Sequence, residues 1–462
     1  MIHSARTIDG YKHERQEAKT FKHISFLRFL LRYPILLLAF GPPIFRTPSD
    51  IVDATKGILD IWSFIQVGLL VMITSRALWR MARARSIFIP KQIRTIFYLV
   101  FILNILFLMS STYSPSRPVS AAYAILYFLT LICVYEFILD VYSNPPILLR
   151  FIFHLRKTAI LLFILDFIVL PFLPNYIMTR IPEEGIRFTG GAVGPVGLIC
   201  SIIAIVSAYT FLHSLESRVR SAMLFFVGFI GTFSTQSRGC EIALVVSLAF
   251  LGFTWARTGR YTAYMFVSGF SLFILIFGIL TVSAGVEHLW SIFNRGGDTR
   301  SFENASGRAE AWNYVIQYCM SRPWGMGYIA GFRLIFRSYF SFESGQNLSH
   351  IGNAHSTYIQ VLSDAGWLAL AIYLVMLVNI VRLAMRFANT HTYIKLNHYS
   401  IYRMTIECSL VMLLFCLTMG ISSADYDIPL RIYFYWQFII IAVILSASAR
   451  VLTDARARHI IL

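Results

Sequence analysis

The chain has few charged residues. Of its 462 residues, 14% are charged and 57% are hydrophobic. Soluble domains are about 25% charged and about half apolar. The composition therefore argues against an ordinary soluble enzyme and predicts a protein embedded in a bilayer.

Cysteines and acidic residues are also scarce. The six cysteines show no CxxC spacing, which argues against a zinc site or a disulfide scaffold. Lys and Arg number 40 against 23 Asp and Glu, so the formal net charge is +17. A membrane protein places such an excess mainly in its cytoplasmic loops, and we expect no nucleic-acid partner.

Long apolar segments recur along the chain. Because a helix needs about 20 apolar residues to cross the hydrocarbon, they predict an all-α, polytopic membrane protein with about twelve transmembrane helices. Their approximate limits are 26–45, 57–75, 95–111, 119–142, 157–176, 191–212, 221–235, 240–256, 262–284, 356–380, 404–422 and 429–449. The predicted divisions are a cytoplasmic segment (1–25), helices one to nine (26–284), a loop domain (285–355), helices ten to twelve (356–449) and a cytoplasmic tail (450–462).

The basic residues predict the orientation. The N-terminal segment through Arg32, the even-numbered connections and the C-terminal tail together hold 27 of the 40 Lys and Arg residues. The positive-inside rule places these segments, and so both termini, in the cytoplasm. The long loop then lies on the outer face.

This outer loop contains a helical pattern from Ser306 to Met320. An apolar stripe runs along it, and Arg322-Pro323 ends it. The stripe consists of Trp312, Val315, Ile316, Cys319 and Met320. We therefore expect one large, folded, helical loop on the periplasmic side.

Three arginines on the predicted outer face are candidate anion ligands. Arg187 precedes a Gly-Gly pair, Arg238 precedes Gly239, and Arg308 opens the loop helix one turn before Trp312. A guanidinium binds phosphate bidentately and remains charged, which suits the pyrophosphate leaving group of a lipid-linked donor. Alternatively, these side chains extend to headgroups or pair with local acids such as Glu183.

His355 is the candidate base. Topology places three of the eleven histidines outside, at 288, 350 and 355. His355 stands at the start of span ten, where the helix dipole and neighbouring arginines favour an uncharged imidazole. Such an imidazole can take a proton from a sugar hydroxyl. The alternative is a histidine that only caps the loop.

Other polar residues receive weaker assignments. Trp312, Asn353, Tyr358 and Asp425 are candidate acceptor or structural contacts. Asp425 and Asp427 are similar to a metal-binding acidic pair, but we expect no metal and no cofactor. Acids inside the spans, including Glu136, Asp364 and Glu407, indicate either an ion pathway or paired structural roles.

The order of short motifs between about 180 and 370 resembles the O-antigen ligase and Wzy-type polymerase superfamily. The motifs are Arg187-x-x-Gly-Gly, Ser-Arg238-Gly, Gly-Arg308-x-x-x-Trp, Pro323-Trp-Gly-Met-Gly, Asn353-Ala-His-Ser-Thr-Tyr and Asp364-Ala-Gly. The resemblance implies an inverting, metal-independent glycosyltransferase in the bacterial inner membrane. It would use undecaprenyl-pyrophosphate-linked oligosaccharide at the periplasmic face.

The resemblance also implies roles for individual residues. Arg187 and Arg238 would hold the pyrophosphate, His355 would activate the acceptor, and Arg308 would organise the loop or add a phosphate contact. We expect a Wzy-like polymerase that acts on an acceptor glycan, with a possible chain-length regulator as partner. The alternatives are an O-antigen ligase that transfers to lipid A core and, from another class, a transporter, which the lack of an internal repeat disfavours.

Overall fold

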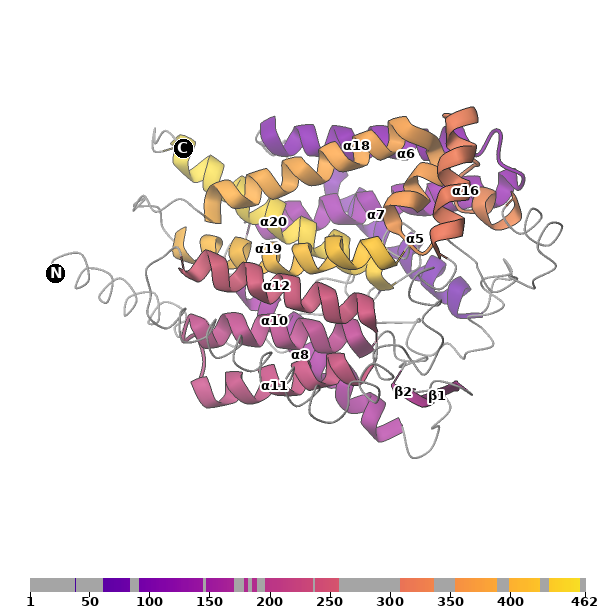
Figure 1. The fold of residues 1–462 in the computed structure, drawn as a ribbon. Helices are drawn as coiled ribbons and strands as arrows, with labels where there is room; N and C mark the ends of the chain where they lie inside the picture. Colours follow the sequence, from indigo (N-terminus) through magenta and orange to yellow (C-terminus); the bar gives the residue numbers. More distant parts are fainter. Residues whose placement is uncertain are drawn as a thin grey trace.

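The structure, a computed structural model, is described here for part of the chain. The described residues are 38, 61–83, 91–143, 147–169, 178–181, 185–188, 196–235, 237–256, 308–335, 354–388, 399–423 and 432–457. Within these ranges the chain forms eleven α-helices and one two-stranded hairpin (Figure 1). The fold is therefore predominantly helical, as the sequence predicts.

The helices follow the apolar segments closely. They are α5 (Ile61–Arg83), α6 (Lys91–Ser110), α7 (Arg117–Ser143), α8 (Ile147–Val169), α10 (Val196–Leu212), α11 (Arg218–Ser234), α12 (Arg238–Ala256), α16 (Arg308–Ser321), α18 (Thr357–Ala388), α19 (Tyr399–Ser422) and α20 (Ile432–Ala457). Ten of the twelve predicted spans coincide with one of these helices. The spans predicted at 26–45 and 262–284 lie outside the described residues, apart from Leu38.

Six of the described helices are long and apolar enough to cross a membrane: α5, α6, α7, α18, α19 and α20. Two shorter apolar helices, Val196–Leu212 and Gly239–Thr254, lie beside them in the bundle. These helices confirm a multi-pass membrane protein. The total of twelve spans and the side on which each loop lies remain predictions.

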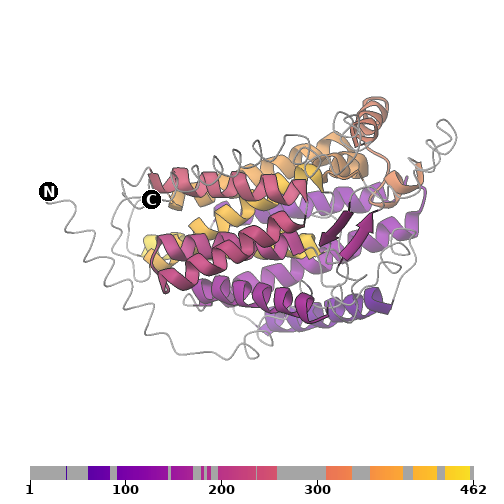
Figure 2. The same ribbon diagram turned by 60° about the horizontal axis from the view of Figure 1, so that its bottom comes forward.

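The helices lie side by side with their axes roughly aligned (Figures 1 and 2). Helix α19 is central and packs against α8, α12, α18 and α20. Helix α10 packs against α8, α11 and α12, which explains why it is apolar on every side. A Cβ at Gly228 of α11 would lie 2.6 Å from the carbonyl oxygen of Cys200, so glycine allows α10 and α11 to approach closely.

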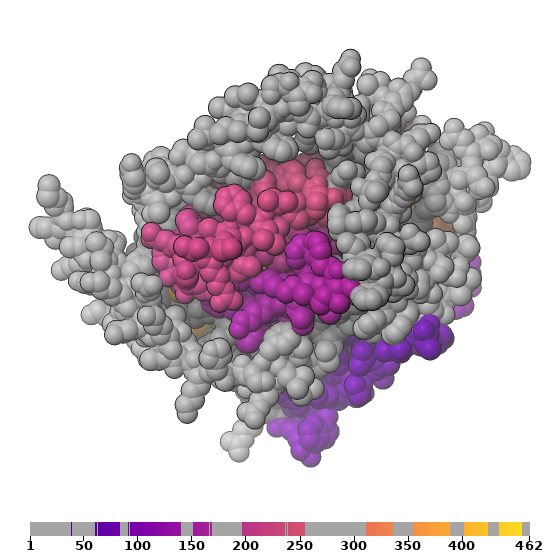
Figure 3. All heavy atoms as spheres, turned by 90° about the horizontal axis from the view of Figure 1, so that it is seen from below, coloured from indigo at the N-terminus to yellow at the C-terminus, as the bar shows by residue number. Residues whose placement is uncertain are grey.

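One face of the bundle exposes apolar side chains. Seen from below, the segment from α8 to α12 forms a magenta-to-pink surface (Figure 3). On α11 the exposed side chains include Val219 at 70%, Met223 at 64% and Ile230 at 63%. A helix with this outward apolar face is suited to contact lipid chains.

The all-α prediction needs one correction. Strands β1 (Met178–Ile181) and β2 (Gly185–Phe188) form an antiparallel hairpin in which Thr179 pairs with Arg187. The hairpin lies at the same end of the bundle as α16 (Figures 1 and 2). We name this end, defined by α16 and the hairpin, the loop end, and the opposite end, where α20 finishes at Ala457, the tail end.

Helix α18 is not the continuous span that the apolar run 356–380 predicts. Its backbone leaves the helical region at Ala365 (φ −143°) and Gly366 (φ 78°). The turn after α16 fills this break: Met326 N–H donates to the carbonyl of Ser363, and Trp367 N–H donates to the carbonyl of Pro323 at 3.1 Å. The turn thus replaces helical hydrogen bonds that the break removes.

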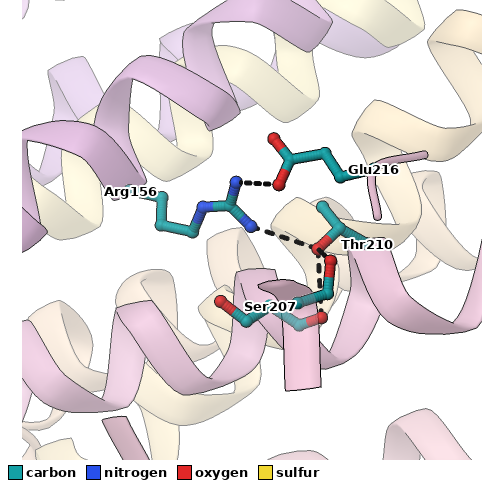
Figure 4. Close-up of polar contacts among 5 residues, drawn as sticks. Arg156, Ser207, Thr210 and Glu216 are labelled. Carbon is teal, nitrogen blue, oxygen red and sulfur yellow. Dashed lines mark hydrogen bonds and ion pairs between the residues drawn. The ribbon is translucent and has the colours of Figure 1, made fainter. Parts of the chain in front are cut away.

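Buried charges at the tail end join the helices. Arg156 of α8, 1% exposed, donates to Glu216 at 2.6 Å and to Thr210 at 3.1 Å (Figure 4). Glu407 accepts from Tyr209 at 2.9 Å and from Arg403 at 2.8 Å. Glu407 therefore has the paired structural role that the sequence left open, as does Glu136, which pairs with Arg80.

Candidate active site

The C-terminal end of α19 binds the residues that follow His355. Thr357 Oγ1 donates to the carbonyl of Ser423 at 2.7 Å, and Ser356 Oγ to that of Gly420 at 3.5 Å. One residue later, the Tyr358 hydroxyl donates to the carbonyl of Leu417 at 2.9 Å. Carbonyls at a helix C-terminus lack helical partners, so Ser356 and Thr357 satisfy two acceptors at the end of α19. Tyr358 is therefore a structural contact between α18 and α19.

The same end of α19 contacts the start of α12. Arg238 is the first residue of α12. A Cβ at the next residue, Gly239, would overlap Ser422 Oγ, so glycine lets α12 start close against this turn of α19. Cys240 Sγ lies 3.8 Å from Met419 Sδ. The backbone positions of Arg238 and His355 are therefore both fixed against one turn of α19.

The start of α10 joins this group. A Cβ at Gly197 would lie 2.9 Å from Cys240 Sγ and 3.2 Å from Thr235 Oγ1, so α10 starts beside the junction of α11 and α12. Arg187 lies in β2, which ends eight residues before α10 starts. Its strand is at the loop end, and its side chain lies outside the described residues.

Helix α16 is attached to the residue before His355. Trp312 Nε1 donates to the carbonyl of Ala354 at 2.7 Å. Arg308, the first residue of α16, lies one helical turn before Trp312. The predicted apolar stripe is largely confirmed because Val315 and Cys319 are fully buried, but Met320 was wrongly included, since it is 73% exposed.

His355 itself has an unusual backbone. Its φ is 49°, in the left-handed region that costs a non-glycine residue free energy. The side chain is partly exposed, whereas Ala354, Ser356 and Thr357 on either side are buried. His355 is thus a partly accessible group in a rigid, buried frame, which suits a residue that must receive a proton.

The turn after α16 is fixed to α18 through Asp364. This carboxylate is fully buried, and its Oδ1 accepts from Gln360 Nε2 at 2.8 Å and from Ile329 N–H at 2.9 Å. Its Oδ2 has no hydrogen-bond partner among the described residues. Asp364 was considered from the sequence as an intramembrane acid; the structure adds its role in ordering the turn.

Another loop supports this turn from the side. The Tyr113 hydroxyl donates to the carbonyl of Trp324 at 2.5 Å, and Tyr328 N–H donates to Ser110 Oγ at 2.9 Å. Burial, together with the negative charge of Asp364, raises the pKa of Tyr113 to about 12. Tyr113 therefore remains a protonated hydrogen-bond donor at neutral pH.

Sequence reasoning missed Gln360 and the hydroxyl pair Ser356 and Thr357. The hydroxyls were visible as a polar pair after His355, but nothing in the sequence identifies their partners on α19. Gln360 lies in an apolar run and has no motif of its own.

The structure does not place every predicted side chain. The side chains of Arg187, Arg238 and Arg308 are outside the described residues, as are Asn353 and Asp425 entirely. Among the side chains that are described, no three His, Cys, Asp or Glu residues group as ligands for a metal ion. The structure therefore brings together three parts of the chain: the backbone at Arg238, the backbone at His355, and helix α16, which begins at Arg308.

Part of the chain is similar to a known protein family. Residues 223–374 match the family described as O-antigen ligase (Wzy_C), a segment that includes Arg238, Arg308 and His355. No curated protein matches the chain. The predicted resemblance to the O-antigen ligase and Wzy-type polymerase superfamily is confirmed for residues 223–374, which are similar to that family.

Proposed function

We propose that the chain transfers a glycan from undecaprenyl pyrophosphate to a sugar hydroxyl at the periplasmic face of the bacterial inner membrane, as a polysaccharide polymerase. The main support is the convergence at the loop end. The stretches that bear Arg238 and His355 both pack on the last turn of α19, and α16, which Arg308 opens, is bonded to the residue before His355.

His355 is the proposed general base. It takes the proton of the acceptor hydroxyl onto an imidazole nitrogen. The acceptor oxygen then forms a bond to the anomeric carbon as the bond from that carbon to the pyrophosphate oxygen breaks. Attack from the face opposite the leaving group inverts the anomeric configuration. The products are the elongated glycan and undecaprenyl pyrophosphate.

The arginines are the proposed ligands of the leaving group. Charge on the pyrophosphate grows as the bond breaks, and a guanidinium already in place stabilises that charge without reorganisation. Arg238, Arg187 and Arg308 are assigned this role, with Arg308 also organising the loop. Helices α10, α12 and α18 all begin at the loop end, so their N-terminal dipoles add to the anion-binding potential there.

An assay with the purified protein reconstituted in liposomes tests this function. Purified protein in liposomes receives undecaprenyl-pyrophosphate-linked oligosaccharide on the outer side only. We expect lengthened glycan from the native chain and none from His355→Ala at equal protein level. Arg238→Ala should lower donor turnover more than Arg238→Lys, because lysine keeps the charge but loses the bidentate fork. Uptake of the lipid without a new glycosidic bond would favour a transporter instead.

A second candidate is O-antigen ligase activity, which the family's description favours. It uses the same donor and chemistry but transfers the glycan to lipid A core. A deletion strain separates the two activities. Loss of a polymerase leaves single repeats, whereas loss of a ligase leaves long lipid-linked chains that are not joined to core.

A further inference from the structure

The residue before His355 is held by two side chains from different helices. Ala354 is fully buried, and its N–H donates to Gln360 Oε1 at 2.9 Å. Its carbonyl accepts from Trp312 Nε1 at 2.7 Å. Both polar groups of this residue are therefore used, and neither belongs to regular secondary structure. The two side chains that bind these groups therefore determine the backbone position from which His355 extends.

The orientation of the Gln360 amide is also determined. Its Nε2 donates to Asp364 Oδ1 at 2.8 Å. Because that oxygen also accepts Ile329 N–H, it acts as an acceptor and the amide nitrogen must face it. The amide oxygen then faces Ala354. Gln360 is 1% exposed, so water does not compete for either bond.

The strained backbone of His355 needs such support. A non-glycine residue at φ 49° persists only where its surroundings determine the conformation. On the far side, Ser356 and Thr357 are bonded to α19. On the near side, Gln360 supplies the bond to Ala354. Without that bond, Trp312 alone holds Ala354, which can then rotate, and His355 can relax toward an unstrained conformation that moves the imidazole.

We propose that Gln360 is a positioning residue that fixes the backbone of His355 through Ala354, and that Asp364 orients Gln360 for this task. The proposal rests on the proposed role of His355 as base. Asp364 also binds the turn after α16, so docking of the turn and placement of His355 are linked through one carboxylate.

Hydrogen exchange of the Ala354 amide tests the structural part without any substrate. In Gln360→Leu, which keeps a side chain of similar size but removes the acceptor, exchange of this amide should accelerate by about ten-fold. The matched control is Gln437→Leu. Gln437 is a buried amide in α20 that donates to the Tyr373 hydroxyl at 3.1 Å and not to Ala354. This control should leave Ala354 exchange unchanged.

Kinetics test the functional part. Gln360→Leu should lower kcat for glycan transfer by roughly 10- to 100-fold, because a small displacement of a reacting group has effects of that size. The KM for undecaprenyl-pyrophosphate-linked oligosaccharide should change by less than about three-fold, because Gln360 does not touch the donor. Gln437→Leu should keep the native kcat.

A pH profile separates positioning from general loss of structure. In Gln360→Glu, the new carboxyl and Asp364 repel each other only when both are ionised, which burial disfavours. When the new carboxyl is protonated it donates to Asp364 and still accepts from Ala354, as the native amide does. Activity relative to the native chain should therefore be highest at acidic and neutral pH and fall toward alkaline pH in Gln360→Glu, and remain constantly low in Gln360→Leu. If Gln360→Leu fails to fold, this pH profile alone tests whether Gln360 positions His355.

The outcomes are distinct. Unchanged Ala354 exchange in folded Gln360→Leu, native kcat in that variant, or a flat relative pH profile in Gln360→Glu overturns the proposal. Equal kcat losses in Gln360→Leu and Gln437→Leu also overturn it, because the effect is then general. Normal turnover by His355→Ala would instead refute the role of His355 in the proposed function, whatever the exchange data show.

Discussion

Trp312 donates its indole N–H to the carbonyl oxygen of Ala354 at 2.7 Å, so helix α16 is bonded to the residue before His355. The two residues are 42 positions apart in the chain. This bond joins the loop helix, which begins with Arg308, to the start of α18. It is the contact through which a change in α16 can reach the proposed base.

Replacing this indole tests the connection. Trp312→Phe leaves the buried Ala354 carbonyl without its donor, which should cost about 1–3 kcal/mol in the free energy of unfolding. The turnover number should fall as well. The control is Trp324→Phe, whose side chain is 70% exposed and should tolerate the change in both measurements. Equal stability and turnover in the two variants would show that the bond to Ala354 has no role.

The break in α18 depends on glycine. In Gly366→Ala, the new Cβ would overlap the carbonyl oxygen of Pro323, and φ 78° is unfavourable for alanine. We expect a loss of about 2–4 kcal/mol in the free energy of unfolding. Gly68→Ala in α5 is the control because nothing lies within 4 Å of its added Cβ. Thermal unfolding in detergent compares them, and equal unfolding temperatures would contradict the observed break.

The buried ion pair at the tail end supports the bundle. Arg156→Met leaves Glu216 without the guanidinium that it contacts at 2.6 Å, and should cost about 3–5 kcal/mol. Arg156→Met combined with Glu216→Gln should cost less, because no charge then remains unpaired. Arg450→Ala, which breaks a more exposed pair with Asp454, should cost at most about 1 kcal/mol. If the double variant is less stable than Arg156→Met, the pair is not the source of the effect.

Cys319 should react slowly with maleimide. It is fully buried in α16, and burial, with the charge of Asp364 adding to it, raises the pKa of its thiol to about 12. Since the thiolate is the nucleophile, and both pH 7 and pH 9 lie below this pKa, the thiol stays protonated at both. Mass spectrometry of peptides from the labelled, folded protein should show little modification of Cys319 at either pH. Denaturation in detergent should make Cys319 react. Rapid labelling in the folded state would contradict the observed packing of α16.

The sequence was sufficient to predict most helices but not the contacts between them. Apolar length alone located ten described helices, and Pro323 correctly marked the end of α16. The break at Gly366 was missed because the run 356–380 has helical periodicity on both sides of it. Among the described residues, the docked turn, about 40 positions earlier in the chain, supplies the hydrogen bonds that stabilise the break.

Contacts over long distances in the chain explain the other differences. Tyr113 and Trp324 are 211 positions apart, and no local pattern relates them. Gln360 looks like an isolated polar residue in an apolar helix until Ala354 and Asp364 are seen beside it. The motifs indicated which residues matter, whereas their support comes from the packing of α12, α16, α18 and α19.

The most direct test of the proposed site is a structure of the protein with undecaprenyl pyrophosphate bound. We predict that the diphosphate lies at the loop end, in contact with the guanidinium of Arg238 and of Arg187 or Arg308, with the His355 imidazole facing the position of the anomeric carbon. A diphosphate bound at the tail end, or arginine side chains that point away from His355, would contradict the proposed site.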